Sequence, residues 1–170
     1  MPAFHDAEKM TPEEAYEQLE QAQQWMDADR CNEALDLAET CLNAFYNSVE
    51  PEGIFDALVL IQTIFQNAGD LSGARPYLEE AVAFSRQTLG EEHPETARFI
   101  SLLGVLLDKC GDYAGAKAYY EKALSINLVA LGEEDPETAT CLNNLGYILQ
   151  AMGNPLAARD YYEQIGRAHV

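Results

Sequence analysis

The sequence has few basic residues and no long apolar run. No stretch approaches the ~18 consecutive apolar residues of a membrane-spanning helix, so no such helix is expected. Residues 1–10 lack the basic start and apolar stretch of a secretory signal peptide, and we therefore expect a cytoplasmic protein. Wholesale disorder is excluded, because 48% of the 170 residues are hydrophobic, which is enough to bury a core.

The shortage of basic residues gives the chain a large negative charge. It contains 10 Lys and Arg residues against 29 Asp and Glu residues, a formal net charge of −19 at pH 7. Residues 1–70 carry 15 of the acidic residues and only two basic ones, Lys9 and Arg30. Because such a chain repels phosphate and anionic lipid, we expect no nucleic-acid or membrane partner. The charge favours a basic or neutral protein partner, although solubility alone explains it equally well.

Residues suited to metal binding or catalysis are scarce and scattered. No two cysteines form a CxxC pair and none lies near a histidine in the sequence, so we expect buried, reduced thiols and neither metal nor cofactor. The motifs GxSxG, GxGxxG, HExxH and the Walker loop are absent, and we expect no enzyme activity. The cysteines and histidines are Cys31, Cys41, Cys110, Cys141, His5, His93 and His169.

The chain is organised by an internal repeat. The segment LGEEHPETA at residues 89–97 recurs as LGEEDPETA at residues 131–139, an offset of 42. Glycine, alanine and tyrosine positions keep the same register over three units, and an X-Pro-Glu mark opens each of four. We expect a disordered tail over 1–10 and a repeat domain over 11–164, with units at about 11–47, 48–89, 90–131 and 132–164.

Each unit is predicted to form two helices. The proline of each X-Pro-Glu mark suits the first helical position, where no intrahelical partner exists for its missing N–H. Thr11 with Glu14 has the pattern of a capping box, and Asp135 is a good N-cap. His93 occupies the position of Asp135 in the preceding unit, which indicates a helix cap rather than a metal or acid–base site. Glycines that follow the first helices supply the left-handed residue that ends them, at Gly69, Gly111 and Gly153.

Small residues recur where the two helices of a unit would meet. Gly104 and Gly146 leave room for a close approach, and aromatic residues such as Tyr120 and Tyr162 fill the remaining space. No segment shows the alternation of a strand. The sequence therefore predicts an all-α fold, a right-handed α-solenoid of stacked antiparallel helix pairs whose last unit is truncated.

The 42-residue period and the LGEEHPET and LNNLG stretches resemble the tetratricopeptide repeat (TPR). They are most similar to the longer repeats of the kinesin light chain type, which also occur in many bacterial repeat proteins. The resemblance is strong over residues 89–164, fair over 48–88 and weak over 11–47. It implies a protein-binding scaffold whose groove, lined by the first helices, takes an extended or helical peptide.

By register, the resemblance also implies which residues face the groove, about one per turn of each first helix. The implied residues are Asp56, Val59, Thr63 and Gln66 in the second unit, Arg98, Ser101, Val105 and Asp108 in the third, and Thr140, Asn143, Tyr147 and Gln150 in the fourth. Tyr16, Leu19, Gln23 and Met26 would extend this surface into the first unit.

Two of these positions have more than one interpretation. Asn143, or its neighbour Asn144, matches an asparagine that in this family can hold the backbone of a bound peptide. The same amides could instead make a hydrogen bond between repeats. Arg98 is either an anchor for a partner or a member of a surface ion pair. The carboxylate clamp of chaperone-tail binders needs several lysines on this face, which the sequence lacks.

The last six residues, IGRAHV, do not fit the repeat. Ile165 stands where the motif has alanine, and Gly166 where it has leucine. The hexapeptide also matches the translation of a common sequencing adapter. We therefore expect residues 165–170 to be non-native, and the natural protein to continue with further repeats.

Two functions are consistent with these observations. The first is a non-catalytic adaptor that presents a concave peptide-binding surface. The alternative is a regulatory array within a larger signalling protein, whose effector domain is missing from this chain. The full reading frame would separate them, since an appended effector domain favours the second.

Overall fold

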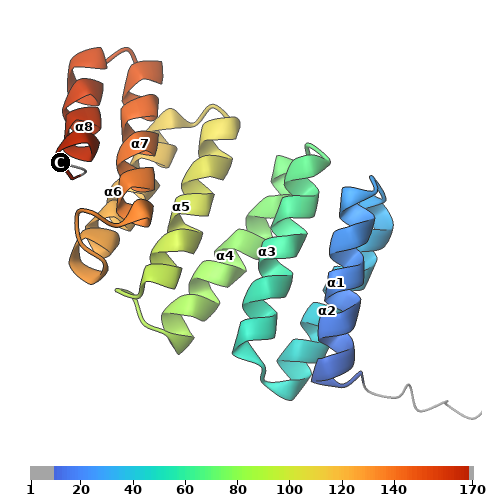
Figure 1. Ribbon diagram of the computed structural model, residues 1–170. Coiled ribbons are helices and arrows are strands. Elements are labelled where there is room, and N and C mark those ends of the chain that lie inside the picture. The colour runs from blue at the N-terminus through green and yellow to red at the C-terminus, as the bar shows by residue number, and fades with distance from the viewer. Residues whose placement is uncertain (1–9, 169–170) are drawn as a thin grey trace, which may run out of the picture. The chain divides into compact units, whose positions relative to one another are not determined.

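The computed structural model describes residues 10–168, which form eight α-helices and, over that range, no strand (Figure 1). This confirms the predicted all-α fold of helix pairs. Most of the predicted N-terminal tail lies outside the described residues. Within them, none of the helices is long and apolar enough to cross a membrane. The helices are α1 (Pro12–Asp27), α2 (Cys31–Ser48), α3 (Pro51–Asn67), α4 (Leu71–Thr88), α5 (Pro94–Lys109), α6 (Tyr113–Ala130), α7 (Pro136–Ala151) and α8 (Pro155–Ala168).

The chain divides into two compact units, residues 1–74 and 75–170, called unit 1 and unit 2 from here on. In unit 1, α2 packs against both α1 and α3, and α1 also contacts α3. In unit 2, α6 packs against α5 and α7, α7 packs against α8, and α5 contacts α7. Within each unit the first helices of successive pairs are therefore neighbours, which is the arrangement that a shared binding face requires.

The helix caps are those predicted from the X-Pro-Glu marks. The Thr11 hydroxyl accepts a hydrogen bond from the Glu14 backbone N–H at 3.2 Å, and the Glu14 carboxylate accepts one from the Thr11 N–H at 2.8 Å. His93 Nδ1 accepts from the Glu95 N–H at 3.1 Å, as the Asp135 carboxylate accepts from Glu137 at 2.8 Å. The interpretation of His93 as a helix cap is thus confirmed.

The turn inside each pair needs a residue with positive φ. Gly69, Gly111 and Gly153 supply it with φ between 74° and 80°, as predicted. In the first pair the same place is taken by Asp29, with a φ of 61°. Aspartate tolerates the left-handed region better than most residues with a side chain. The first pair therefore keeps the turn without the glycine that marks it in the others.

Aromatic rings occupy the space that certain glycines leave empty. A Cβ atom on Gly104 would lie 2.7 Å from Cε1 of Tyr120, and one on Gly146 would lie 2.5 Å from Cε1 of Tyr162. These contacts confirm the close approach predicted for Gly104 and Gly146. A third contact of this kind, between Gly53 of α3 and Phe45 of α2, was not predicted. Each ring fixes one helix against a neighbour that has no side chain there.

Helix α8 continues through Ile165 and Gly166 to Ala168. Ile165 is half-buried, and a Cβ atom on Gly166 would have no atom within 4 Å apart from its own chain neighbours and the nearby helix backbone. The non-native origin of residues 165–170 stays a prediction, and residues 169–170 lie outside the described part of the chain.

Candidate functional site

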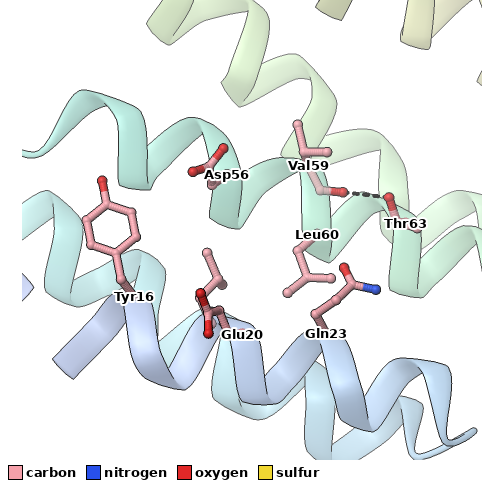
Figure 2. A pocket seen from close by; sticks show the side chains of 8 residues that line it. Tyr16, Glu20, Gln23, Asp56, Val59, Leu60 and Thr63 are labelled. Carbon is pink, nitrogen blue, oxygen red and sulfur yellow. Dashed lines mark hydrogen bonds between the residues drawn. The ribbon is translucent and has the colours of Figure 1, made fainter. Parts of the chain in front are cut away.

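A pocket of about 350 Å³ lies between α1 and α3 in unit 1, and we call it the α1/α3 pocket (Figure 2). Its lining combines apolar, acidic and neutral polar side chains. The lining residues are Tyr16, Leu19, Glu20, Gln23, Asp56, Val59, Leu60 and Thr63.

Helical periodicity explains why these residues meet. On α1 they stand at positions 16, 19, 20 and 23, and on α3 at 56, 59, 60 and 63. Spacings of three and four residues place side chains on one face of a helix. The two helices contact each other, so the same face of each contributes half of the pocket. Leu19 and Leu60 are 8% and 5% exposed and form its floor.

The rim of the pocket is negatively charged. Glu20 of α1 and Asp56 of α3 are both exposed and contribute carboxylates from the two sides (Figure 2). Among the described residues, those that line the pocket include no basic side chain. Arg30, the one basic residue of the sequence between positions 10 and 74, lies 4.6 Å over the Trp25 ring and pairs with Glu33. The described lining of the pocket therefore carries a formal negative charge.

Tyr16 and Thr63 each contribute a hydroxyl group to the pocket, and the two groups have different surroundings. Burial raises the pKa of Tyr16, and the nearby Asp56 carboxylate raises it further, so the phenol stays protonated at neutral pH. Its ring packs against Phe45, with centroids 4.7 Å apart. The Thr63 hydroxyl donates to the Val59 carbonyl at 2.7 Å and accepts from Gln62 Nε2 at 2.8 Å. Thr63 is thus held in place by its own helix.

The predicted groove residues of unit 1 converge only in part. Asp56, Val59 and Thr63 line the α1/α3 pocket together with Tyr16, Leu19 and Gln23. Gln66 lies outside the pocket lining and donates to Gln62 Oε1 at 2.9 Å, and Met26 is buried in the core.

Two lining residues, Glu20 and Leu60, were missed by the sequence analysis. The repeat register gives one residue per helical turn. A pocket between two helices also receives the residue one position later on each of them, because positions i+3 and i+4 flank the same stripe. Glu20 adds a second carboxylate to that of Asp56 in the pocket lining.

In unit 2, Arg98 of α5 forms an ion pair. Its guanidinium pairs with the Glu95 carboxylate, with Nε 2.9 Å from Oε1, and its Cζ lies 4.7 Å from the centroid of the Phe99 ring. Arg98 therefore forms an ion pair with Glu95, and its role as an anchor for a partner stays a prediction. Val105 and Asp108 on the same helix are half-buried, and burial raises the pKa of Asp108.

Ser101, also on α5, is engaged with a buried thiol. Burial raises the pKa of Cys141 on α7 to about 11, and side-chain hydrogen bonds with Ser101 and Asn127 oppose that rise. Asn127 Nδ2 lies 3.6 Å from Cys141 Sγ, and its Oδ1 is buried with no hydrogen-bond partner among the described residues. Ser101 therefore lies beside Cys141 where α5 contacts α7, and its place on the groove face stays a prediction.

We expect Asn127→Ala to change the free energy of unfolding of unit 2 by less than about 1 kcal/mol, although Asn127 is buried. The variant loses packing but also removes a desolvated acceptor, whose burial typically costs about 1–3 kcal/mol. Ile126→Ala, at the adjacent buried position, is the control and should cost about 2–5 kcal/mol. Urea denaturation followed by circular dichroism measures both, and equal losses would contradict the expectation.

The predicted residues of α7 lie on its surface. Thr140, Asn143, Tyr147 and Gln150 are exposed, and Asn144 is half-buried. The Thr140 hydroxyl donates to the Pro136 carbonyl at 2.9 Å, and Gln150 Oε1 accepts from the Tyr162 hydroxyl at 3.4 Å. Within the described range, Asn143 forms no hydrogen bond, so its amide is available to a partner.

Metal chemistry has no candidate residues in this part of the protein. Among residues 10–168, no group of three or more His, Cys, Asp or Glu side chains is arranged to hold a metal ion. The chemistry that the α1/α3 pocket offers is recognition by charge, by hydrogen bonds and by apolar contact.

Known structures share this arrangement of helix pairs. BtubC (BKLC) from P. vanneervenii superposes with a TM-score of 0.81 at 22% identity, over 96% of this chain and 66% of that chain. Kinesin light chain TPR-like repeats from Podosopora anserina superpose with a TM-score of 0.74 at 23% identity. The match covers 91% of this chain and 74% of that chain. The apo form of RapI superposes with a TM-score of 0.81 at 14% identity, over 92% of this chain and 43% of that chain.

At these identities the structural likeness establishes the fold, an α-solenoid of helix pairs, which confirms the predicted fold class. The chain spans less than two thirds of the length of BtubC and of RapI. Comparison with curated protein sequences gives no significant match. The family profile for the tetratricopeptide repeat matches residues 53–126 and 100–165. Because these matches cover well over half of its residues, the chain belongs to the tetratricopeptide repeat family.

Proposed function

We propose that this protein is a non-catalytic scaffold that binds an extended, basic or neutral segment of a partner protein on its first helices. The observation that carries the proposal is the α1/α3 pocket. Six of its eight lining residues stand at positions where the repeat register implies a groove. Its volume of about 350 Å³ suits the side chains of a peptide.

The composition of the pocket supports binding rather than catalysis. Among the described residues its lining includes neither cysteine, lysine nor histidine, the side chain most often used as a general base. The apolar floor formed by Leu19 and Leu60 and the carboxylates at the rim match the mixed character of a small recognition site.

A second proposed surface lies on unit 2. It consists of the exposed residues of α7, Thr140, Asn143, Tyr147 and Gln150, together with Asn144 and the neighbouring α5 residues Arg98, Val105 and Asp108. The amide of Asn143 offers a donor and an acceptor together, which suits a peptide backbone. Ser101 of α5, which is half-buried beside Cys141, completes this proposed surface.

Val59→Arg is expected to abolish peptide binding at the α1/α3 pocket. Val59 is half-buried in the pocket lining, so a long side chain at this position fills the space that a ligand needs. The measurement is selection of random peptides displayed on phage against the wild-type protein, followed by fluorescence anisotropy with the enriched peptides. We expect the dissociation constant to rise by about tenfold or more in the variant.

The matched control is Val129→Arg, which makes the same change at a residue of α6 that is 82% exposed. It should bind the enriched peptides as the wild type does. Asn143→Ala, measured in the same assay, reports on the surface of unit 2. If no peptide is enriched, or if the enriched peptides bind Val59→Arg and Asn143→Ala as tightly as the wild type, the proposed function is wrong.

A further inference from the structure

A small basic pocket lies on the second helices of unit 2, and we call it the α4/α6 pocket. It has a volume of about 280 Å³, and its lining residues are Arg86 of α4 with Ala118, Tyr119 and Lys122 of α6. None of them belongs to the surfaces proposed above for peptide binding. We propose that this pocket binds the phosphate group of a phosphorylated side chain, in competition with the protein's own Glu91 carboxylate.

The charge of the α4/α6 pocket is opposite to that of the whole chain. Both charged residues in its described lining are basic, although the chain carries a formal net charge of −19. Most of that excess belongs to residues 1–70, because residues 71–170 carry eight basic residues against fourteen acidic ones. Glu121, which precedes Lys122 on α6, is paired with Lys117 at 2.6 Å. The pocket therefore attracts an anion locally.

A carboxylate of the protein is already bound to the two basic side chains. Arg86 Nε lies 2.7 Å from Glu91 Oε2, and Lys122 Nζ lies 2.5 Å from Glu91 Oε1. Lys122 and Arg86 together hold the pKa of Glu91 below its ordinary value. Glu91 lies in the loop between α4 and α5, so the charged ends of residues from two helices converge on it. The contact shows that Arg86 and Lys122 are close enough to share one oxyanion.

Glu91 neutralises only half of the charge of this pair. A guanidinium has five N–H donors and an ammonium has three, so both retain capacity for a second acceptor. The side chains of Arg86, Lys122 and Glu91 are 40%, 44% and 50% exposed, and a ligand can therefore reach them. A phosphate monoester carries about −1.5 to −2 charges at pH 7 and three acceptor oxygens. That larger charge favours phosphate over a carboxylate as the competitor of Glu91.

The repeat itself does not require this ion pair. One repeat later, the equivalents of Arg86, Glu91 and Lys122 are Leu128, Glu133 and Gln164. The two loops are nevertheless held in the same way. Before α5, the Thr96 hydroxyl donates to the Gly90 carbonyl at 2.8 Å, and before α7 the Thr138 hydroxyl donates at 2.7 Å to the carbonyl of Gly132. Because the second loop keeps this contact without the basic pair, holding the loop does not account for Arg86 and Lys122.

The test is a titration of the isotope-labelled chain with Nα-acetyl-phosphoserine methylamide, followed by amide chemical shifts. Saturable shifts are expected at the four lining residues and at Glu91. The Arg86→Gln, Lys122→Gln double variant should raise the dissociation constant by about tenfold or more. The glutamate analogue has less charge and should bind more weakly. Inorganic phosphate should also bind more weakly, since it lacks the side-chain atoms that would contact Ala118 and Tyr119.

Glu91→Gln is the most informative variant, because it removes the competing carboxylate. It should lower the dissociation constant by about threefold or more. Glu133→Gln is the matched control: it removes the same charge at the equivalent position one repeat later and should leave the dissociation constant unchanged. The double variant Lys117→Gln, Arg159→Gln removes two basic residues of α6 and α8 outside the pocket, and should also have no effect. Circular dichroism verifies the folding of each variant.

Several outcomes would overturn the proposal. One is a pocket double variant that binds as tightly as the wild type, and another is a control double variant that loses as much affinity as the pocket variant does. If Glu133→Gln strengthens binding as much as Glu91→Gln, the effect is one of net charge and the proposed competition is wrong. Equal binding of the glutamate analogue or of inorganic phosphate would overturn the assignment to a phosphorylated side chain. None of these results depends on peptide binding at the α1/α3 pocket.

Discussion

Tyr120→Ala is expected to lower the free energy of unfolding of unit 2 by about 3–5 kcal/mol. Tyr120 lies on α6, is 2% exposed, and its ring occupies the place of the missing side chain of Gly104 on α5. Truncation therefore opens a cavity at the contact of two helices that no neighbouring side chain can fill. Hydrogen exchange measured by mass spectrometry, over peptides from residues 75–168, reports this loss for unit 2 separately from unit 1.

Gly104→Ala tests the same contact from the other side. The added methyl group would lie 2.7 Å from a ring that is almost fully buried, and we expect a loss of about 1–3 kcal/mol in the free energy of unfolding. Gly146→Ala is the matched comparison: its methyl group would lie 2.5 Å from Tyr162, but that ring is half-exposed and can turn aside. Gly146→Ala should therefore lower the free energy of unfolding by less than Gly104→Ala does, despite the shorter distance.

A double variant decides whether the two residues form one contact. In the Tyr120→Ala variant the space beside Gly104 is empty. Adding Gly104→Ala to that variant should therefore lower the free energy of unfolding only slightly, or raise it by restoring packing. The combined loss should then be smaller than the sum of the two single losses. Additive losses would mean that Gly104 and Tyr120 stabilise unit 2 independently, and would contradict a single shared contact.

Both units are expected to lose stability as the pH rises from 9 to 11. Burial raises the pKa of Cys41 in unit 1 and of Cys141 in unit 2 from 9.0 to about 11. The unfolded thiols ionise near pH 9 while the folded ones stay protonated, so the stability present below pH 9 is lost as the pH passes through the folded pKa. Each shift corresponds to at most about 2–3 kcal/mol.

Tyr120 adds to this loss in unit 2. Burial raises its pKa above the ordinary value of 10.0, and the Asp108 carboxylate raises it further. The unfolded phenol ionises first, so its contribution is lost as the pH rises above 10. Tyr120→Phe should therefore flatten the decline of unit 2 above pH 10 and leave unit 1 unchanged.

The measurement is the free energy of unfolding of each unit from pH 7 to 11, by denaturation with hydrogen exchange as the local readout. Cys41→Ala should reduce the decline of unit 1, and Cys141→Ala that of unit 2. Cys110 is exposed, so Cys110→Ala is the control and should leave both profiles unchanged. A decline that persists in full in the Cys41 and Cys141 variants would contradict the assignment.

Local patterns were sufficient to predict the helix pairs. A proline after a capping residue and a glycine that adopts positive φ act within a few residues of chain, so each helix boundary could be inferred from its own neighbourhood. The turn at Asp29 was not predicted, because aspartate tolerates the left-handed region but also occurs widely outside it, so its presence does not mark a turn. Because the repeat offset is constant, the pairing of a glycine with an aromatic residue in one repeat predicted the same pairing in the next.

The site was predictable only to the level of a helix face. The sequence placed Asp56 and Tyr16 on faces that point the same way, because helical periodicity is fixed by the backbone. It could not give the rotation of α1 relative to α3, which brings Glu20 and Leu60 into the pocket and leaves Gln66 outside it. That rotation results from side-chain packing between neighbouring helices, which includes the fit of Phe45 against Gly53.

By itself, then, the sequence determined the repeat, its helices, their caps and the excess of negative charge, since each depends on residue type and on spacing along one chain. Only the tertiary structure decided that Ser101 lies beside a buried thiol, that Arg98 pairs with Glu95, and that Glu20 and Asp56 line one pocket with two buried leucines. Those outcomes depend on distances between side chains of different turns and helices, which packing sets and periodicity leaves open.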